Sequence, residues 1–95
     1  SDQITLVAPD IAENGAVVPV TVSTEMEGVT QIAMLVAKNP TPLAAVFNMG
    51  EDAKAMASTR LKMGKTSDMV AVVKAGDKSF TAKQEIKVTI GGCGG

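Results

Sequence analysis

The stretch MVAVVKAGDKSFTAKQEIKVTI, residues 69–90, decides which fold class we expect for this chain. Near its end apolar and polar residues alternate, with Ile86, Val88 and Ile90 on one face and Glu85, Lys87 and Thr89 on the other. This period of two is typical of a strand in a sheet that buries one face. Gly76-Asp77-Lys78 interrupts the stretch and is a hairpin signal. The stretch therefore predicts two strands, residues 69–75 and 80–90, joined by a tight turn.

The rest of the chain repeats the same kind of segment at short spacing. Strand-like runs separated by Gly, Pro, Asn and Asp cover residues 4–8, 15–24, 29–37, 43–49 and 58–63. Pro19 removes a ladder donor from the second run and predicts an edge position or a bulge there. Residues 50–57 could form one helical turn, but no long helix is expected. The pattern predicts an all-β fold, an immunoglobulin-like β-sandwich of about seven antiparallel strands.

The composition favours one domain. The chain has 95 residues, of which 45% are hydrophobic. That is enough for a single core without a metal or a disulfide framework. We assign residues 1–90 to the sandwich and residues 91–95 to a flexible C-terminal arm.

Residue types that are missing exclude several functions. The sequence has no histidine, so Ser-His-Asp and Cys-His catalytic arrangements and imidazole metal sites are impossible. It has no glycine-rich phosphate-binding pattern between a strand and a helix. We expect no catalytic residue, no cofactor and no metal. A net charge of −1 and the absence of Tyr and Trp argue against nucleic-acid binding, and no apolar run is long enough to span a membrane.

The terminal sequence VTIGGCGG, residues 88–95, contains the only cysteine. A buried cysteine packs as a small hydrophobe, yet no apolar side chain follows Ile90 except Cys93 itself. Its neighbours cannot bury a side chain and are costly to order: they are Gly91, Gly92, Gly94 and Gly95. We predict an arm that presents the Cys93 thiol for covalent attachment of a substrate. From Ile90 to Cys93 it spans at most ~10 Å, enough to enter a cleft.

Other candidate sites are weaker. Glu25 and Glu27 could form a carboxylate pair for acid–base chemistry, but a solvated loop is the better interpretation. Ser58, Arg60 and Lys62 alternate onto one strand face, which could dock an anion but is more typical of a solvated sheet face. The six methionines are scattered and are expected to fill the core.

The segment 29–37 is apolar on both faces. One face holds Ile32, Met34 and Val36, and the other holds Val29, Ala33, Leu35 and Ala37. A strand of this kind is expected beneath a second layer, which could be another subunit. We name Ile32, Met34 and Val36 as a candidate partner interface and expect the isolated chain to form homo-oligomers.

Four segments resemble the SoxY family, the sulfur carriers of the Sox thiosulfate-oxidising system: PDIAENGAVVPVTV, KNPTPLAAVF, ASTRLKMGKTSDMVAVV and VTIGGCGG. The likeness runs from about Ile4 to Gly95. It implies an immunoglobulin-like sandwich that pairs with a second sandwich protein, SoxZ, and a cysteine, Cys93, that holds the sulfur substrate covalently.

The resemblance also implies partner enzymes and a compartment. The haem protein SoxAX would couple thiosulfate to the cysteine as an S-thiosulfonate, SoxB would release sulfate, and in some systems a sulfane dehydrogenase oxidises the remaining sulfur. Family members carry an export signal and act in the periplasm. This sequence begins at Ser1 without such a signal, as a processed or trimmed product would.

Two other functions are open at this stage. Ubiquitin-like sulfur carriers end in Gly-Gly and form a terminal thiocarboxylate, but they need a helix packed across a sheet. A structural immunoglobulin-like module could instead dimerise through a disulfide at Cys93. The site of sulfur attachment, Cys93 or the Gly95 carboxylate, separates the first from the SoxY-like carrier, and normal function of Cys93→Ser would favour the second.

Overall fold

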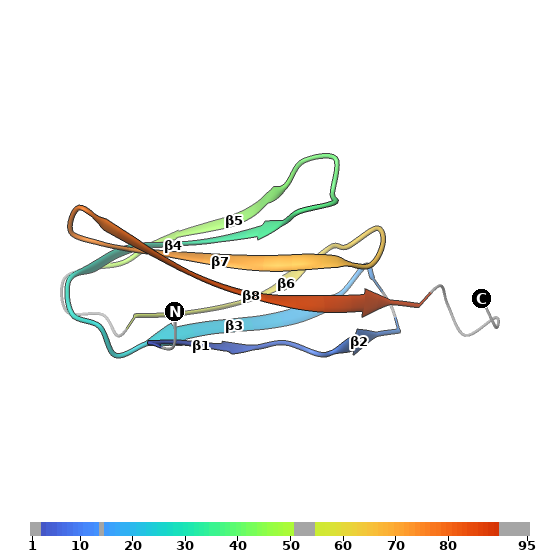
Figure 1. Cartoon of the computed structure of the whole chain (residues 1–95), viewed down its shortest axis with the longest axis horizontal. Helices are drawn as coiled ribbons and strands as arrows, with labels where there is room; N and C mark the ends of the chain where they lie inside the picture. The colour runs from blue at the N-terminus through green and yellow to red at the C-terminus, as the bar shows by residue number, and fades with distance from the viewer. Residues whose placement is uncertain (1–2, 14, 51–54, 90–95) are drawn as a thin grey trace.

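Two β-sheets pack face to face in the computed structural model of the chain (Figure 1), which describes residues 3–13, 15–50 and 55–89. The smaller sheet has the order β1-β3-β6, with β1 Ile4–Val7, β3 Val18–Thr24 and β6 Ala55–Leu61. The larger sheet has the order β2-β8-β7-β4-β5. Its strands are β2 Ile11–Ala12, β8 Lys78–Val88, β7 Ser67–Ala75, β4 Val29–Val36 and β5 Leu43–Asn48. The predicted all-β sandwich is confirmed.

The number and direction of the strands differ slightly from the prediction. The described residues form eight strands, because the two-residue β2 joins the edge of the larger sheet. This strand runs parallel to β8, with Ile11 opposite Lys87, whereas the other paired strands are antiparallel. The helical turn considered at residues 50–57 is wrong for residues 55–57, which begin β6. Residues 51–54 lie outside the described part.

The hairpin between β7 and β8 has the predicted tight turn. Ala75 pairs with Lys78, so the loop contains only Gly76 and Asp77. Gly76 has φ 64°, and Asp77 does not have a positive φ. Glycine in the left-handed region at the first loop position matches the type II′ turns that suit the twist of a hairpin.

Alternating side chains from both sheets form the core. Alternate residues of β3, β4 and β7 are completely buried between the two sheets. They are Val18 and Val22 of β3, Ile32, Met34 and Val36 of β4, and Met69, Ala71 and Val73 of β7. Five of the six methionines belong to or pack against this core: Met34, Met63, Met69 and the partly buried Met26 and Met49. The expectation that methionine mainly fills the core is therefore confirmed.

The partner interface predicted on Ile32, Met34 and Val36 is corrected by this packing. All three side chains have no solvent-exposed area in the single chain, because they face the smaller sheet. A partner cannot contact them without opening the core.

Pro19 lies on the section of β3 that has a neighbour on one side only. It pairs with Arg60 of β6, but β1 pairs only with Thr21–Thr24. A residue without an N–H is tolerated where no second strand requires it. The edge position predicted from the sequence is therefore found only at the beginning of β3, where β1 does not pair with it.

Gly15 makes a close backbone approach to Met63, which joins two loops of the sandwich. The backbone N–H of Met63 donates a hydrogen bond to the Gly15 carbonyl, with an N–O distance of 2.6 Å. A Cβ added to Gly15 would collide with the Met63 carbonyl oxygen, whereas one added to Gly64 would meet nothing within 4 Å. Only glycine lets these two loops meet in this way.

We expect Gly15→Ala to lower the free energy of unfolding by about 1–3 kcal/mol, because the backbone of one loop must move. The control is Gly64→Ala, for which a change within about 0.5 kcal/mol is expected. Urea denaturation of both variants measures the difference. Equal stability of the two variants would contradict the close-approach argument.

Candidate functional site: the root of the C-terminal arm

The candidate site is the end of β8, from which the C-terminal arm continues. The described chain ends at Thr89. The predicted carrier residues Gly91, Gly92, Cys93, Gly94 and Gly95 lie outside the described residues. What the structure shows is how the chain is held immediately before them.

Hydrogen bonds hold the end of β8 on two sides. On one side Lys87 N–H donates to the Asp10 carbonyl (2.9 Å) and Thr89 N–H to the Ala12 carbonyl (3.0 Å). On the other side Val88 N–H donates to Thr66 Oγ1 (2.9 Å). Successive amides are thus held by different neighbours, so the direction in which the chain leaves the sandwich is fixed.

Three loops surround this end of the sandwich, and hydrogen bonds join them. We call residues 13, 15–17, 37–42 and 62–66 the arm-end loops, because β8 ends beside them (Figure 1). Asn39 bridges two of them, donating from Nδ2 to the Lys62 carbonyl (2.7 Å) and accepting from Gly64 N–H at Oδ1 (3.4 Å). The Met63–Gly15 hydrogen bond described above joins the third.

Buried Ser67 attaches the second of these loops to β7. Its Oγ accepts a hydrogen bond from Lys38 N–H and donates one to the Asp68 carbonyl, both at 3.0 Å. The same carbonyl accepts a hydrogen bond from Ala37 N–H at 3.1 Å. A buried hydroxyl with both functions satisfied fixes the local geometry. The arm-end loops therefore form one connected base for the arm.

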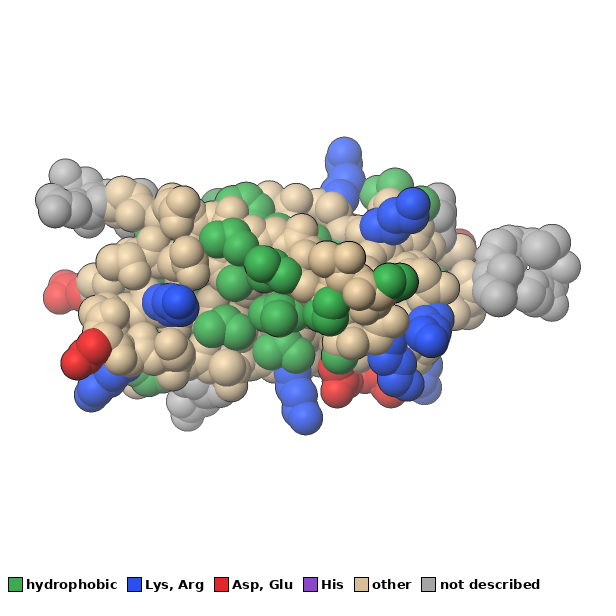
Figure 2. All heavy atoms as spheres, turned by 90° about the horizontal axis from the view of Figure 1, so that it is seen from above, with side chains coloured by type: hydrophobic (Ala, Val, Ile, Leu, Met, Phe, Trp, Pro, Cys, Tyr) green, Lys and Arg blue, Asp and Glu red, His purple; other side chains and the backbone are tan. Residues whose placement is uncertain are grey.

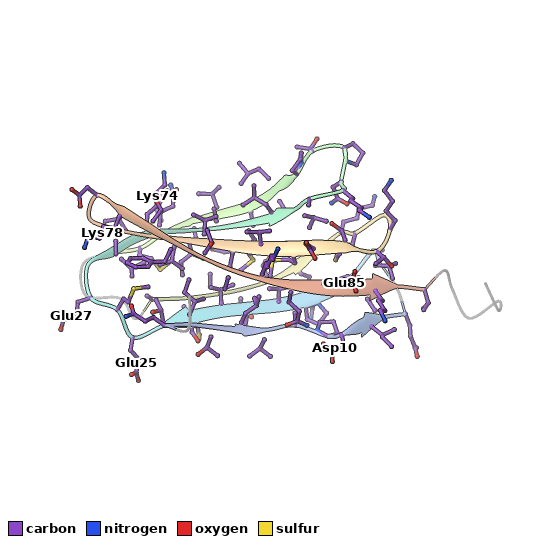
Figure 3. All side chains as sticks on the ribbon, viewed as in Figure 1. Asp10, Glu25, Glu27, Lys74, Lys78 and Glu85 are labelled. Atoms are coloured by element: carbon purple, nitrogen blue, oxygen red, sulfur yellow. The ribbon has the colours of Figure 1, made fainter. Side chains whose placement is uncertain are left out.

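The other residues singled out in the sequence lie elsewhere. Glu25 and Glu27 are exposed in the β3–β4 loop at the opposite end of the sandwich (Figure 3). This fits the solvated-loop interpretation. Ser58 and Arg60 face outward from β6, where Ser58 Oγ and Thr21 Oγ1 share a hydrogen bond of 2.9 Å.

Residues 3–13, 15–50 and 55–89 contain no group of three or more His, Cys, Asp or Glu side chains that could hold a metal ion. No helix within these same residues is long and apolar enough to cross a membrane.

The outward side of the larger sheet carries a cluster of apolar side chains. We call it the outer apolar face and define it by six residues on β4, β5 and β7: Ala33, Leu35, Leu43, Val46, Val70 and Val72. The pairing aligns them, since Ala33 lies between Val46 and Val72, and Leu35 lies between Leu43 and Val70. Leu43 and Val46 are 52% and 44% exposed. Apolar side chains gather in this way on the face seen in Figure 2.

The outer apolar face is the second face of the strand that the sequence showed to be apolar on both sides. The sequence analysis placed the candidate interface on Ile32, Met34 and Val36, which form the buried face of β4. In residues 69–75, Val70 and Val72 stand between buried residues, and this alternation is the signal that separates the outward face from the buried one.

The fold and the terminal sequence together define a class of protein: a small immunoglobulin-like β-sandwich whose only cysteine follows its last strand within a few residues. The family model for the sulfur oxidation protein SoxY matches residues 1–93. The chain therefore belongs to the SoxY family, and the match includes the cysteine.

A comparison with solved structures gives the same family. The chain is similar to the sulfur carrier protein SoxY from Chlorobium limicola f thiosulfatophilum, with 46% identity and a TM-score of 0.84 over 95% of this chain and 82% of that one. A chain from a study of T cell activation by the superantigen toxic shock syndrome toxin-1 matches at 9% identity and a TM-score of 0.61, covering 90% of this chain and 99% of that one. An engineered protein matches at 14% identity and a TM-score of 0.58, covering 93% of this chain and 20% of that one. The last two show the fold alone. No curated protein sequence matches the chain.

We expect Thr66→Val to loosen the end of β8 without unfolding the sandwich, because it removes only the acceptor of the Val88 N–H. The loss of one hydrogen bond is worth about 1 kcal/mol. Amide exchange at Val88 should then become several-fold faster, while that of Val73 in the core stays unchanged. Ser58→Ala, which removes a hydroxyl contact far from β8, is the control. Unchanged exchange at Val88 would show that Thr66 does not hold the root of the arm.

Proposed function

We propose that this chain is a covalent sulfur carrier of thiosulfate oxidation, which holds sulfur intermediates on Cys93 and presents them to partner enzymes. The observation that carries the proposal is the family match through residue 93, together with a solved relative that is a sulfur carrier protein at 46% identity. The only cysteine stands in a glycine-rich terminus directly after a firmly held strand. An arm of this kind is suited to carrying a bound group into another protein.

The chemistry needs only a thiol from this chain. In the loading step the Cys93 thiolate and thiosulfate form a sulfur–sulfur bond and release two electrons to a haem partner of the SoxAX type. In the next step water attacks the terminal sulfone, as a SoxB-type hydrolase would catalyse, so that sulfate leaves and a persulfide remains on Cys93. A sulfane dehydrogenase could oxidise that sulfur further. Catalytic groups belong to the partners, and the carrier itself is not an enzyme.

Residues 1–90 and 91–95 have separate tasks in this proposal. The sandwich holds the root of the arm, and the arm carries the thiol. A glycine arm has no side chain to obstruct a narrow channel. Covalent attachment keeps a labile sulfur intermediate from diffusing away between enzymes. The periplasm, where the Sox system of the family acts, is the compartment we propose.

The outer apolar face is where we place the SoxZ-like partner or, in the isolated chain, a second copy. A contiguous apolar patch on a soluble protein is typical of an interaction site. By contrast, the outer face of the smaller sheet carries Thr5, Thr21, Ser23 and Ser58 among its outward residues. Val7 and Met56 are also exposed on that face, but hydroxyl side chains separate them, so the larger sheet offers the more continuous apolar surface.

The ubiquitin-like alternative is not supported by the fold. A carrier of that class packs a helix across its sheet, whereas the described residues form strands and no helix. The matched family model and relative also describe a different carrier.

Cys93→Ser should leave stability unchanged within about 0.5 kcal/mol, because the position lies beyond the last core residue of β8. It should abolish sulfate production from thiosulfate in the reconstituted system, since a hydroxyl cannot form the sulfur–sulfur bond. Gly95→Ser, which keeps the thiol, is the control. Intact mass of the parent chain should show reductant-sensitive sulfur adducts. Continued sulfate production by Cys93→Ser would refute the carrier role and favour a structural module.

Val46→Lys should weaken self-association by at least about tenfold, because it places a charge within the outer apolar face. Met56→Lys, which makes the same kind of apolar-to-charged change at an exposed position on the outward face of β6, is the control. Sedimentation in the presence of reductant measures both, which removes any contribution of a Cys93 disulfide. A parent chain that is monomeric under these conditions would contradict the assignment of this face.

A further inference from the structure

The arm-end loops concentrate positive charge beside the root of the arm. Lys38, Lys62 and Lys65 project from two of the loops and are exposed, and Glu13 is the only acidic residue in the three. The loops at the opposite end, residues 25–28 and 76–77, contain only acidic charges: Glu25, Glu27 and Asp77. The sandwich is elongated, with extents of 46 × 21 × 21 Å. Acidic side chains also occur at the arm end, on Asp10, Asp68 and Glu85, and Lys74 and Lys78 lie at the opposite end (Figure 3). The concentration of positive charge is therefore a property of the arm-end loops rather than of the whole end of the sandwich.

Two exposed apolar side chains lie at the same end. Ile11, on the strand that pairs with the end of β8, is 57% exposed, and Val17, in the first arm-end loop, is 49% exposed. Neither is required by the core. Apolar side chains surrounded by charged ones are typical of a surface that contacts another protein, with an apolar centre and a polar rim.

These side chains stand on a connected base. Asn39 joins the loop that contains Lys38 to the loop that contains Lys62 and Lys65. The Gly15–Met63 hydrogen bond joins the loop that contains Val17 to the same Lys62–Lys65 loop. Ala12, next to Ile11, accepts the hydrogen bond from Thr89 N–H. The surface therefore keeps a fixed relation to the point at which the arm begins.

The length of the arm determines which surface a processing enzyme must meet. Cys93 is four positions after Thr89, so the two Cα atoms are at most about 14 Å apart. An enzyme whose reacting atoms lie inside a cleft must therefore bring the mouth of that cleft close to Thr89. At that distance the mouth faces the arm-end loops, whatever the rest of the enzyme looks like.

We infer that Ile11, Val17, Lys38, Lys62 and Lys65 form a docking surface for the proteins that act on Cys93, and that these proteins carry acidic side chains around the mouth of the active site. This inference rests on the proposed carrier function and adds the partner's chemistry to it. Complementary charge speeds association and orients the arm toward the cleft, an effect that salt weakens.

The experiment uses the full chain and the enzyme that couples thiosulfate to Cys93, with adduct formation followed by intact mass. The test variant is the triple change Lys38→Gln, Lys62→Gln and Lys65→Gln. The matched control changes Lys74, Lys78 and Lys83 to Gln, which removes the same charge; Lys74 and Lys78 lie at the other end of the sandwich (Figure 3). At low ionic strength the test variant should load about tenfold more slowly or worse, and the control should stay within about twofold. The parent rate should fall with added salt, and the rate of the test variant should not.

A second pair of variants tests the apolar side chains of the docking surface. Ile11→Ser should raise the half-saturating concentration of carrier by about fivefold or more, since an apolar contact at the centre of an interface is lost. Met56→Ser is the control, because Met56 is also 57% exposed but lies on β6. Alkylation of Cys93 by iodoacetamide, a small neutral reagent, should proceed equally in all variants.

The outcomes separate this inference from the proposed function. Equal slowing by the two lysine triples would mean that only net charge matters, and it would overturn the docking surface. Loading of the test triple at the parent rate, or faster, would also overturn it while leaving the carrier role intact. Failure of the parent chain to accept sulfur on Cys93 would instead refute the proposed function.

Discussion

The packing of β3 against β4 and β7 is the contact on which the remainder of the structure depends. Alternate residues of all three strands are completely buried, and Val20, Ile32 and Val73 are representative members. Each buried side chain of this size contributes roughly 1.5–3 kcal/mol relative to an exposed one. Because the period of a strand is two, fixing one face inward fixes the other outward. The same register that builds the core therefore determines which side chains a partner can meet.

The two sheets use their outward faces differently. The smaller sheet has hydroxyl side chains there, as in the Thr21–Ser58 pair, interspersed with the exposed Val7 and Met56. The larger sheet has valine, leucine and alanine on β4, β5 and β7. β5 is also an edge strand, and its sequence LAAVFN has neither charge nor proline to discourage pairing. An apolar sheet face and an unprotected edge strand are both unfavourable when they are exposed to solvent. Their presence on the same side of the sandwich supports the assignment of a partner there.

Local pattern predicted the elements that depend on neighbours in sequence. The alternation in residues 86–90 predicted the last strand, and Gly76-Asp77 predicted the turn. The terminal glycines and Cys93 predicted the arm, which lies outside the described residues. Burial of Ile32 rather than Ala33 could not be read from β4 alone, because both faces are apolar. The larger residues on the inner face fit the space between two sheets, and that space is a property of the assembled fold.

Hydrogen bonds between residues far apart in the sequence could not be predicted, because they produce no local sequence pattern. Thr66 and Val88 are 22 positions apart, and Asn39 and Lys62 are 23 apart. The two-residue β2 is too short to show any period. These contacts hold the root of the arm, so the part of the site that the sequence did not predict is its support. The reactive residue that we propose, Cys93, was chosen from the sequence alone, because a cysteine among terminal glycines has no apolar neighbours with which to pack.

Distance along β8 separates the two surfaces of the carrier. Val72, near the middle of the outer apolar face, pairs with Thr81, which is eight residues before Thr89 and thus about 26 Å from it along the strand. The arm spans at most about 14 Å beyond Thr89. Cys93 therefore cannot reach the centre of the outer apolar face, and a partner bound there does not meet the sulfur. Such a partner can stay bound while the arm enters one enzyme after another, because each enzyme approaches the end of the sandwich rather than its side. A subunit on the outer apolar face would then have a structural role, and the enzymes that change the bound sulfur would compete with one another only for the arm-end loops.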